Sequence, residues 1–190
     1  MEILLATKNK NKFIELKNIF DQSNSEHELL FYQDLIEVEE DKETIFDNAK
    51  KKAIEVYKEY QKPVISDDSG LFVNSLNGEP GVKSARYAGD HANDEDNIEK
   101  LLNEMENEEN RSASFKTILF FYDGKNELTT EGILDGEITL ERRGDNGFGY
   151  DPIFKYDDKT LAELSLNEKT DISHRNIACT KMVKLLNEKL

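Results

Sequence analysis

The sequence predicts an α/β or α+β fold built around a mixed β-sheet. Two observations lead to this prediction: strands alternate with helices early in the chain, and three or four strands then follow in succession. A chain of 190 residues with 37% hydrophobic residues can bury a sizeable core, and it contains no linker, repeat or low-complexity segment. We therefore expect residues 1–190 to form a single domain.

The first half of the chain alternates short apolar runs with amphipathic segments. An apolar run at the start is typical of a buried strand, and in the predicted helices apolar side chains recur every three or four residues. Asn93 is a suitable N-cap for the third helix. The elements predicted for this half are strands at 3–6, 28–33 and 64–66 and helices at 10–21, 44–60 and 93–105.

The second half begins with strands that follow one another directly. Residues 112–122 are rich in Phe, Ile and Leu, and two shorter strands are expected at 127–133 and 137–141. Glycines over 142–149 indicate a loop, and the helical spacing of apolar residues predicts a final helix at 173–190. These successive strands are the reason for expecting a mixed sheet rather than a purely parallel one.

The charge balance restricts the partners of the protein. The chain has 40 Asp and Glu against 25 Lys and Arg, and its net charge of −15 repels nucleic acid and anionic membranes. No apolar run approaches the roughly 20 residues of a membrane span. The single cysteine, Cys179, suits a reducing cytosol, where we expect it to be a small buried residue. We therefore expect a cytoplasmic protein that binds neither nucleic acid nor membranes, in which any anion site forms a local basic island.

Such a basic island follows the first predicted strand. A turn between a strand and a helix presents backbone N–H groups and the positive end of the helix dipole, and this turn adds three lysines. It lacks the glycines of a Walker A loop, so it is either a phosphate-binding turn or a capped turn in solvent. Its residues are Thr7, Lys8, Asn9, Lys10, Asn11 and Lys12.

Two adjacent aspartates, Asp67 and Asp68, follow the predicted strand at 64–66. The carboxyl end of a strand is where α/β proteins usually bind ligands, and carboxylate oxygens suit Mg²⁺ that is shared with a substrate phosphate. The alternative is an Asx turn before Gly70. Further acidic residues lie at 37–41, where an exposed surface run is the simpler interpretation.

A glycine-rich segment over 144–152 surrounds an aromatic residue. Gly147 and Gly149 allow the backbone to approach a ligand closely, and Phe148 between them is suited to stack on a purine base. A hairpin loop with Phe148 folded into the core explains the same pattern.

Three cationic residues lie near the start of the last predicted helix: Lys169, His174 and Arg175. Ser173 is a natural N-cap, but cations at this end of a helix oppose its dipole and are poor choices for stability. Residues that break a local rule are candidates for function. The alternative is that both His174 and Arg175 point into solvent.

Taken together, the four segments resemble the inosine-triphosphate pyrophosphatase family, the non-standard purine NTP pyrophosphatases, over essentially the whole chain and in the same order. Each segment alone is a weak to moderate signature, but all four in order are specific. The first matching motif is Thr7-x-Asn9-x-x-Lys12, and the central one is Ser66-Asp67-Asp68-Ser69-Gly70-Leu71 together with Gly78-x-Pro80-Gly81-x-x-Ser84-Ala85-Arg86-Tyr87. The third and fourth are Gly147-Phe148-Gly149-Tyr150-Asp151-Pro152-Ile153-Phe154 and Ser173-His174-Arg175.

The resemblance implies a long twisted mixed β-sheet flanked by helices, two lobes with a central cleft, a homodimer and a requirement for Mg²⁺. It implies hydrolysis of ITP, dITP and XTP to the nucleoside monophosphate and pyrophosphate, which keeps deaminated purines out of DNA and RNA. It makes Asp68 the proton acceptor and, with Glu40, a ligand of Mg²⁺. The residues that it implies in binding the triphosphate or the base are Thr7, Lys8, Asn9, Lys10, Asn11, Lys12, Ser69, Phe148, Gly149, Tyr150, Asp151, Lys169, His174 and Arg175.

Three other functions fit parts of the sequence. A nucleotide-binding module that senses without cleaving needs the lysine turn and the aromatic loop, but not Asp67 and Asp68. A related pyrophosphatase for pyrimidine or modified nucleotides keeps the metal site, but not the pairing of Phe148 with residues 173–175. A structural or interaction domain needs only an acidic surface and leaves all four segments unexplained. Pyrophosphate release and its dependence on the substrate separate these functions.

Overall fold

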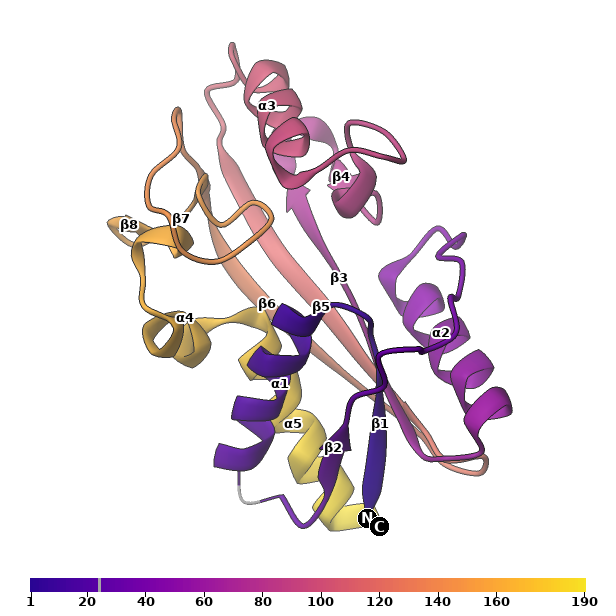
Figure 1. Ribbon diagram of the computed structural model, residues 1–190. Coiled ribbons are helices and arrows are strands. Elements are labelled where there is room, and N and C mark those ends of the chain that lie inside the picture. Colours follow the sequence, from indigo (N-terminus) through magenta and orange to yellow (C-terminus); the bar gives the residue numbers. More distant parts are fainter. Residues whose placement is uncertain (24) are drawn as a thin grey trace. The chain divides into compact units, whose positions relative to one another are not determined.

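The computed structural model describes residues 1–23 and 25–190, and it has the mixed α/β fold expected from the sequence (Figure 1). An eight-stranded sheet has the strand order β2-β1-β3-β5-β6-β7-β8, with β4 paired to β3 beside this path. Within the described residues, no helix has the length and apolar character needed to cross a bilayer. The elements are β1 (Glu2–Ala6), α1 (Lys10–Gln22), β2 (Glu28–Leu30), α2 (Ile45–Tyr60), β3 (Val64–Val73), β4 (Pro80–Gly81), α3 (Asp94–Glu104), β5 (Ser112–Tyr122), β6 (Glu127–Ile138), β7 (Phe154–Tyr156), β8 (Lys159–Thr160), α4 (Leu166–Ile172) and α5 (His174–Lys189).

The chain forms two compact units, in agreement with the two lobes that the resemblance implied. Unit 1 consists of Met1–Asp68, Thr117–Gly132 and His174–Leu190, and unit 2 consists of Ser69–Lys116 and Ile133–Ser173. The boundary falls within β3, β5 and β6, each of which contributes residues to both units. That residues 1–190 act as one domain stays a prediction.

Unit 1 contains three parallel strands and the helices α1, α2 and α5, of which α1 and α5 come from distant parts of the chain. β1 pairs in parallel with both β2 and β3. α1 and α5 lie side by side (Figure 1) and bury Leu16, Phe20 and Met182 in one apolar cluster. Cys179 belongs to the same cluster and is buried, as predicted, and this burial raises the pKa of its thiol. The thiol is therefore a packing residue rather than a nucleophile.

Unit 2 has a separate core between α3 and its own parts of β3, β5 and β6. This core includes Leu71, Leu101 and Phe154, all of them fully buried. Asn93 is the N-cap of α3, as predicted, and forms a capping box with Asp96. These two reciprocal hydrogen bonds fix the first turn of the helix over the core.

The strand that carries the two aspartates is longer than predicted. The sequence indicated a strand at 64–66 followed by a turn, but β3 continues through Asp67 and Asp68 to Val73, so the interpretation as an Asx turn is wrong. Pairing between β1 and β3 ends where Ala6 faces Ser66. The aspartates therefore lie just beyond the carboxyl end of β1, although β3 itself continues past them.

Three further predictions about the elements need correction. The strands expected at 127–133 and 137–141 are one strand, β6, and the strand expected at 28–33 ends at Leu30. Helix α4 was not predicted at all. In β6, Gly136 does not break the strand: a Cβ there would lie 2.4 Å from the carbonyl oxygen of Lys155 in β7, so the glycine allows these strands to approach.

Gly132 allows α5 to lie directly on β6. A Cβ at this position would lie 1.8 Å from the carbonyl oxygen of His174 and 2.8 Å from the amide nitrogen of Ala178. We expect Gly132→Ala to lower the free energy of unfolding by about 3 kcal/mol, because the start of α5 must move off the strand. Urea denaturation measures this loss. Glu131→Ala, at the exposed neighbouring position, should change stability by less than about 0.5 kcal/mol, and equal losses in the two variants would contradict this explanation.

Candidate active site

The turn from β1 into α1 is held by its own side chains. Asn9 is the N-cap of α1, and its Oδ1 accepts hydrogen bonds from the N–H groups of Asn11 at 2.9 Å and Lys12 at 3.2 Å. The N–H of Asn9 donates to Oγ1 of Thr7 at 3.1 Å. Several backbone donors that the sequence predicted for a phosphate are therefore engaged within the turn. The lysine side chains of the turn therefore attract an anion more strongly than its backbone N–H groups do.

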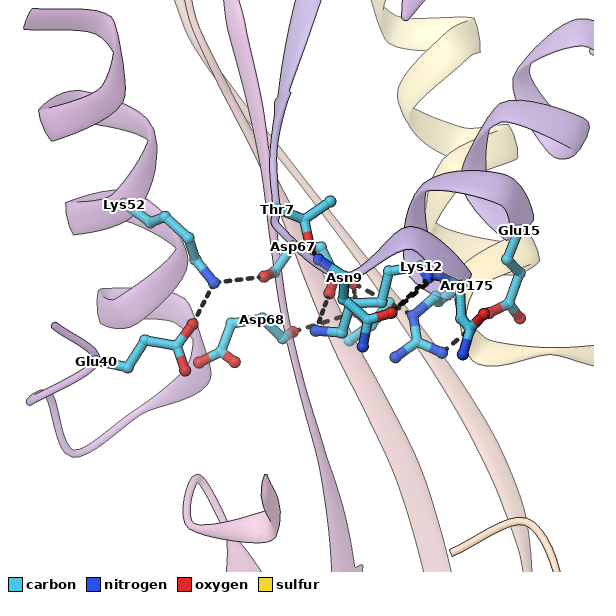
Figure 2. A network of polar contacts seen from close by, with 11 residues as sticks. Thr7, Asn9, Lys12, Glu15, Glu40, Lys52, Asp67, Asp68 and Arg175 are labelled. Atoms are coloured by element: carbon cyan, nitrogen blue, oxygen red, sulfur yellow. Dashed lines mark hydrogen bonds and ion pairs between the residues drawn. The ribbon is translucent and has the colours of Figure 1, made fainter. Parts of the chain in front are cut away.

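Asp67 is a buried carboxylate that contacts side chains from three elements (Figure 2). The Nζ of Lys12 lies 2.5 Å from its Oδ1, the hydroxyl of Thr117 donates to its Oδ2 at 2.8 Å, and the Nε of Arg175 lies 3.5 Å from Oδ2. Burial alone would raise the pKa of Asp67, but Lys12 and Arg175 outweigh it and hold the pKa well below its usual range. Asp67 is thus charged and already engaged, which suits it to position cations rather than to accept a proton.

Asp68 has the opposite electrostatic environment from its neighbour. Successive side chains of a strand point to opposite faces, and the carboxylate of Asp68 points toward that of Glu40 (Figure 2). Burial and, after it, the charge of Glu40 raise the pKa of Asp68 to about 6, although Lys52 and Lys12 oppose this shift. A carboxylate whose pKa lies near neutrality is suited to accept a proton.

The pair of Glu40 and Asp68 fits a divalent cation. The charge of Glu40 helps to raise the pKa of Asp68, and a cation between the two carboxylates would relieve this repulsion. Within residues 1–23 and 25–190, no group of three or more His, Cys, Asp or Glu side chains is arranged to hold a metal. Mg²⁺ commonly uses one or two carboxylates together with substrate phosphates. The donor set therefore fits Mg²⁺ bound jointly with a phosphate rather than in a cage of protein ligands.

Sequence reasoning missed a cation next to this pair, Lys52 of α2. Its Nζ forms an ion pair with Glu40 and donates a hydrogen bond to the main-chain oxygen of Asp67 at 2.8 Å (Figure 2). The side chain of Lys52 is only 12% exposed, whereas its neighbours Lys50 and Lys51 pair with carboxylates at the surface. Lys52 thus belongs to the candidate site, and the other two lysines do not.

The start of α5 is buried against α1 and β3. His174 and Arg175 are 3% and 5% exposed, so the alternative in which both point into solvent is wrong. Nη1 of Arg175 lies 3.1 Å from Oε2 of Glu15, a buried residue of α1 that sequence reasoning also missed. Glu15 and Asp67 together neutralise the guanidinium group and fix its orientation. Ser173 ends α4, with its hydroxyl donating to the carbonyl of Thr170.

Unit 2 contains the aromatic residue that the sequence predicted to contact a base, Phe148. Lys169 of α4 and Asp151 form a buried ion pair, with Nζ 2.7 Å from Oδ2. The same oxygen accepts a hydrogen bond from the N–H of Phe148 at 2.9 Å, and the Nζ of Lys169 lies 4.6 Å from the centre of the Phe148 ring. Gly147 has a φ of +81°, and a Cβ there would lie 2.1 Å from Oδ2 of Asp151. The loop is thereby held with Phe148 half-buried.

The remaining residues that were predicted to bind the substrate differ in how far their side chains are exposed. The side chain of Tyr150 is buried in the core of unit 2 and donates to the carbonyl of Ser84 at 2.8 Å. The N–H of Gly149 donates to Oδ2 of Asp94 at 2.7 Å, and Ser69 is half-buried on β3. The side chain of Tyr150 therefore anchors the loop to the core of unit 2. The residues of the lysine turn that are exposed are Lys8, Asn9, Lys10 and Asn11.

The fold and this set of residues define a protein of the Ham1 family: residues 3–185 match the model of that family, and the chain belongs to it. The dITP/XTP pyrophosphatases of Flavobacterium johnsoniae and Bacillus licheniformis are 44% and 46% identical to this chain. Each alignment covers 98% of this chain and 98% of the relative. The resemblance inferred from the four sequence segments is thus confirmed.

Solved structures agree with the fold. The Ham1 protein of Staphylococcus aureus has a TM-score of 0.89 and 40% identity, and the comparison covers 100% of both chains. A HAM1 protein of Coxiella burnetii has a TM-score of 0.91 and 37% identity, with 99% of both chains covered. The predicted fold class is confirmed by these similarities.

Proposed function

We propose that the protein is a cytoplasmic, Mg²⁺-dependent pyrophosphatase that hydrolyses ITP, dITP and XTP to the nucleoside monophosphate and pyrophosphate. The observation that carries this proposal is the pair of Asp68 and Glu40, two facing carboxylates beside the cations Lys12 and Lys52. Carboxylates for a metal and lysines for phosphates are the groups that stabilise phosphoryl transfer. The relatives named above as dITP/XTP pyrophosphatases support the choice of substrate.

In unit 1, the residues have separable roles in this reaction. Glu40 and Asp68 would hold Mg²⁺, which when bound offsets the negative charge of the phosphates. Lys12, held by Asp67, presents its ammonium group for the triphosphate. Asp68, with a pKa raised toward neutrality, accepts a proton from the attacking water. Arg175, fixed by Glu15 and Asp67, donates to the substrate without having to be ordered first.

In unit 2, the residues suit recognition of the purine. The half-buried Phe148 would stack on a flat base, and the Lys169–Asp151 pair holds the loop in place. Donors aimed at a purine O6 accept hypoxanthine and xanthine. Adenine carries an amino group there and would leave these donors without partners, which costs up to about 3 kcal/mol for each buried donor.

A substrate screen tests the proposed function. We expect phosphate release from ITP, dITP and XTP when inorganic pyrophosphatase is added, and none without it, because the direct product is pyrophosphate. Rates with ATP should be at least about 100-fold lower, and EDTA should abolish activity. Equal rates with ATP, or a preference for dTTP, would contradict the purine selectivity. No release from any triphosphate would favour a non-catalytic binding module.

Light scattering tests the homodimer that the family resemblance implies.

A further inference from the structure

Lys52 lies beside the two carboxylates of the candidate site, but the roles described above give it no separate task. It sits on the inner side of α2, and its Nζ contacts Glu40 and the main-chain oxygen of Asp67. The side chain of Lys52 is only 12% exposed, so its ammonium group is held against the carboxylate of Glu40, which with Asp68 fits a metal.

The ammonium group of Lys52 lies where the proposed function places Mg²⁺, beside Glu40 and Asp68. A lysine ammonium paired with Glu40, whose carboxylate faces that of Asp68 (Figure 2), offsets the repulsion between the two carboxylates, as a divalent cation between them would. The Nζ of Lys52 also bonds directly to Oε1 of Glu40, so a metal that binds this oxygen has to displace the ammonium group. The ammonium group of Lys52 and a divalent cation repel each other when both are close to Glu40. The carboxylate oxygens of Glu40 therefore cannot bind both of them tightly at once.

We propose that Lys52 is a built-in countercharge that competes with Mg²⁺ for Glu40 and Asp68 and so weakens metal binding to the nucleotide-free protein. This inference rests on the proposed function insofar as that function assigns the metal to these two residues. When a triphosphate binds, its phosphates can pair with the ammonium group that the metal displaces from Glu40. Metal and nucleotide would then bind more tightly together than either does alone.

The test is metal binding without nucleotide. Mn²⁺, which is paramagnetic and accepts the same oxygen ligands, is titrated into the full-length protein and followed by electron paramagnetic resonance. We expect Lys52→Met, which keeps most of the side-chain length and removes the charge, to bind Mn²⁺ about tenfold more tightly than the unchanged protein. The same variant should gain more thermal stability from millimolar Mg²⁺ than the unchanged protein does.

Two control variants separate competition from a general change in charge. Lys51→Met removes the same charge from the same helix, where Lys51 pairs with Asp41 at the surface, and should change Mn²⁺ affinity by less than about twofold. Lys52→Arg retains the charge and should not tighten binding, and it also serves if Lys52→Met folds poorly. Equal or weaker Mn²⁺ binding by Lys52→Met overturns the proposal, as does a gain of equal size in Lys51→Met.

Failure of this inference can be told apart from failure of the proposed function. Tighter Mn²⁺ binding by Lys52→Met, together with no pyrophosphate release from ITP or XTP by the unchanged protein, would support the competition and reject the enzymatic activity. Normal hydrolysis by the unchanged protein, with no change in Mn²⁺ affinity in Lys52→Met, would reject the competition alone.

Discussion

Asp68→Asn should lower turnover of ITP by about 10³-fold at saturating Mg²⁺ while leaving the protein folded. Asparagine cannot accept the proton of the attacking water, and loss of a positioned base typically costs between about 10² and 10⁴ in rate. The stability of the metal-free protein should stay the same or rise, because burial and Glu40 disfavour the charge of Asp68 and asparagine carries none. Steady-state kinetics and thermal melting of the same samples measure both effects.

A surface aspartate provides the control for this experiment. Asp21 pairs with Lys17 on the exposed side of α1, and Asp21→Asn should leave turnover unchanged. Near-normal turnover by Asp68→Asn would show that another group accepts the proton. In that case Asp68 would keep only its role as a metal ligand.

Asp67→Asn should be the more damaging change for the fold. The carboxylate is fully buried and holds Lys12, Thr117 and Arg175, so removing its charge leaves a buried guanidinium and an ammonium with less compensation. We expect a loss of about 3 kcal/mol in the free energy of unfolding, measured by urea denaturation. Activity should fall as well, because Lys12 is no longer held in place.

The pH dependence of stability gives a second readout for Asp67. Burial raises its pKa, but Lys12 and Arg175 lower it further, so in the folded protein the pKa lies below the usual 3.8. The stability from this charge is therefore fully present above pH 3.8 and is lost as the pH falls below it. Asp67→Asn should lose less stability than the unchanged protein over this acidic range.

An exposed ion pair is the matched comparison for Asp67. Asp41 also contacts two cationic side chains, Lys42 and Lys51, but it lies at the surface. Asp41→Asn should cost much less stability than Asp67→Asn, because water and salt screen exposed pairs. If the two variants lost the same stability, burial would not be the reason for the importance of Asp67.

Helices and apolar strands were predictable from the sequence where one periodicity covered the whole segment. The spacing of apolar residues over 10–21 and 44–60 led to α1 and α2 with boundaries correct to about one residue. β3 was cut short because two aspartates are unusual inside a strand, and only long-range partners such as Lys12 and Thr117 make their burial possible. Short α4 offers too few residues for a helical period to show.

The candidate site was predictable to the extent that its residues lie in distinctive motifs. The four segments pointed to Asp68 and Phe148, but Glu15 and Lys52 sit in ordinary helix sequence. Lys52 follows two surface lysines, and a run of three reads as a solvated face. One signal was available: Lys52 directly precedes Ala53, which is fully buried, so it borders the inner face of α2.

The way unit 1 is assembled has a consequence for its synthesis on the ribosome. Its core needs α5, which packs against α1 although more than 150 residues separate them in the chain. All of unit 2 is therefore translated before unit 1 can close. Until α5 emerges from the ribosome, the apolar faces of α1 and β1 are not covered by this helix. We therefore expect chaperones to bind most strongly to nascent chains that are halted before α5 is translated.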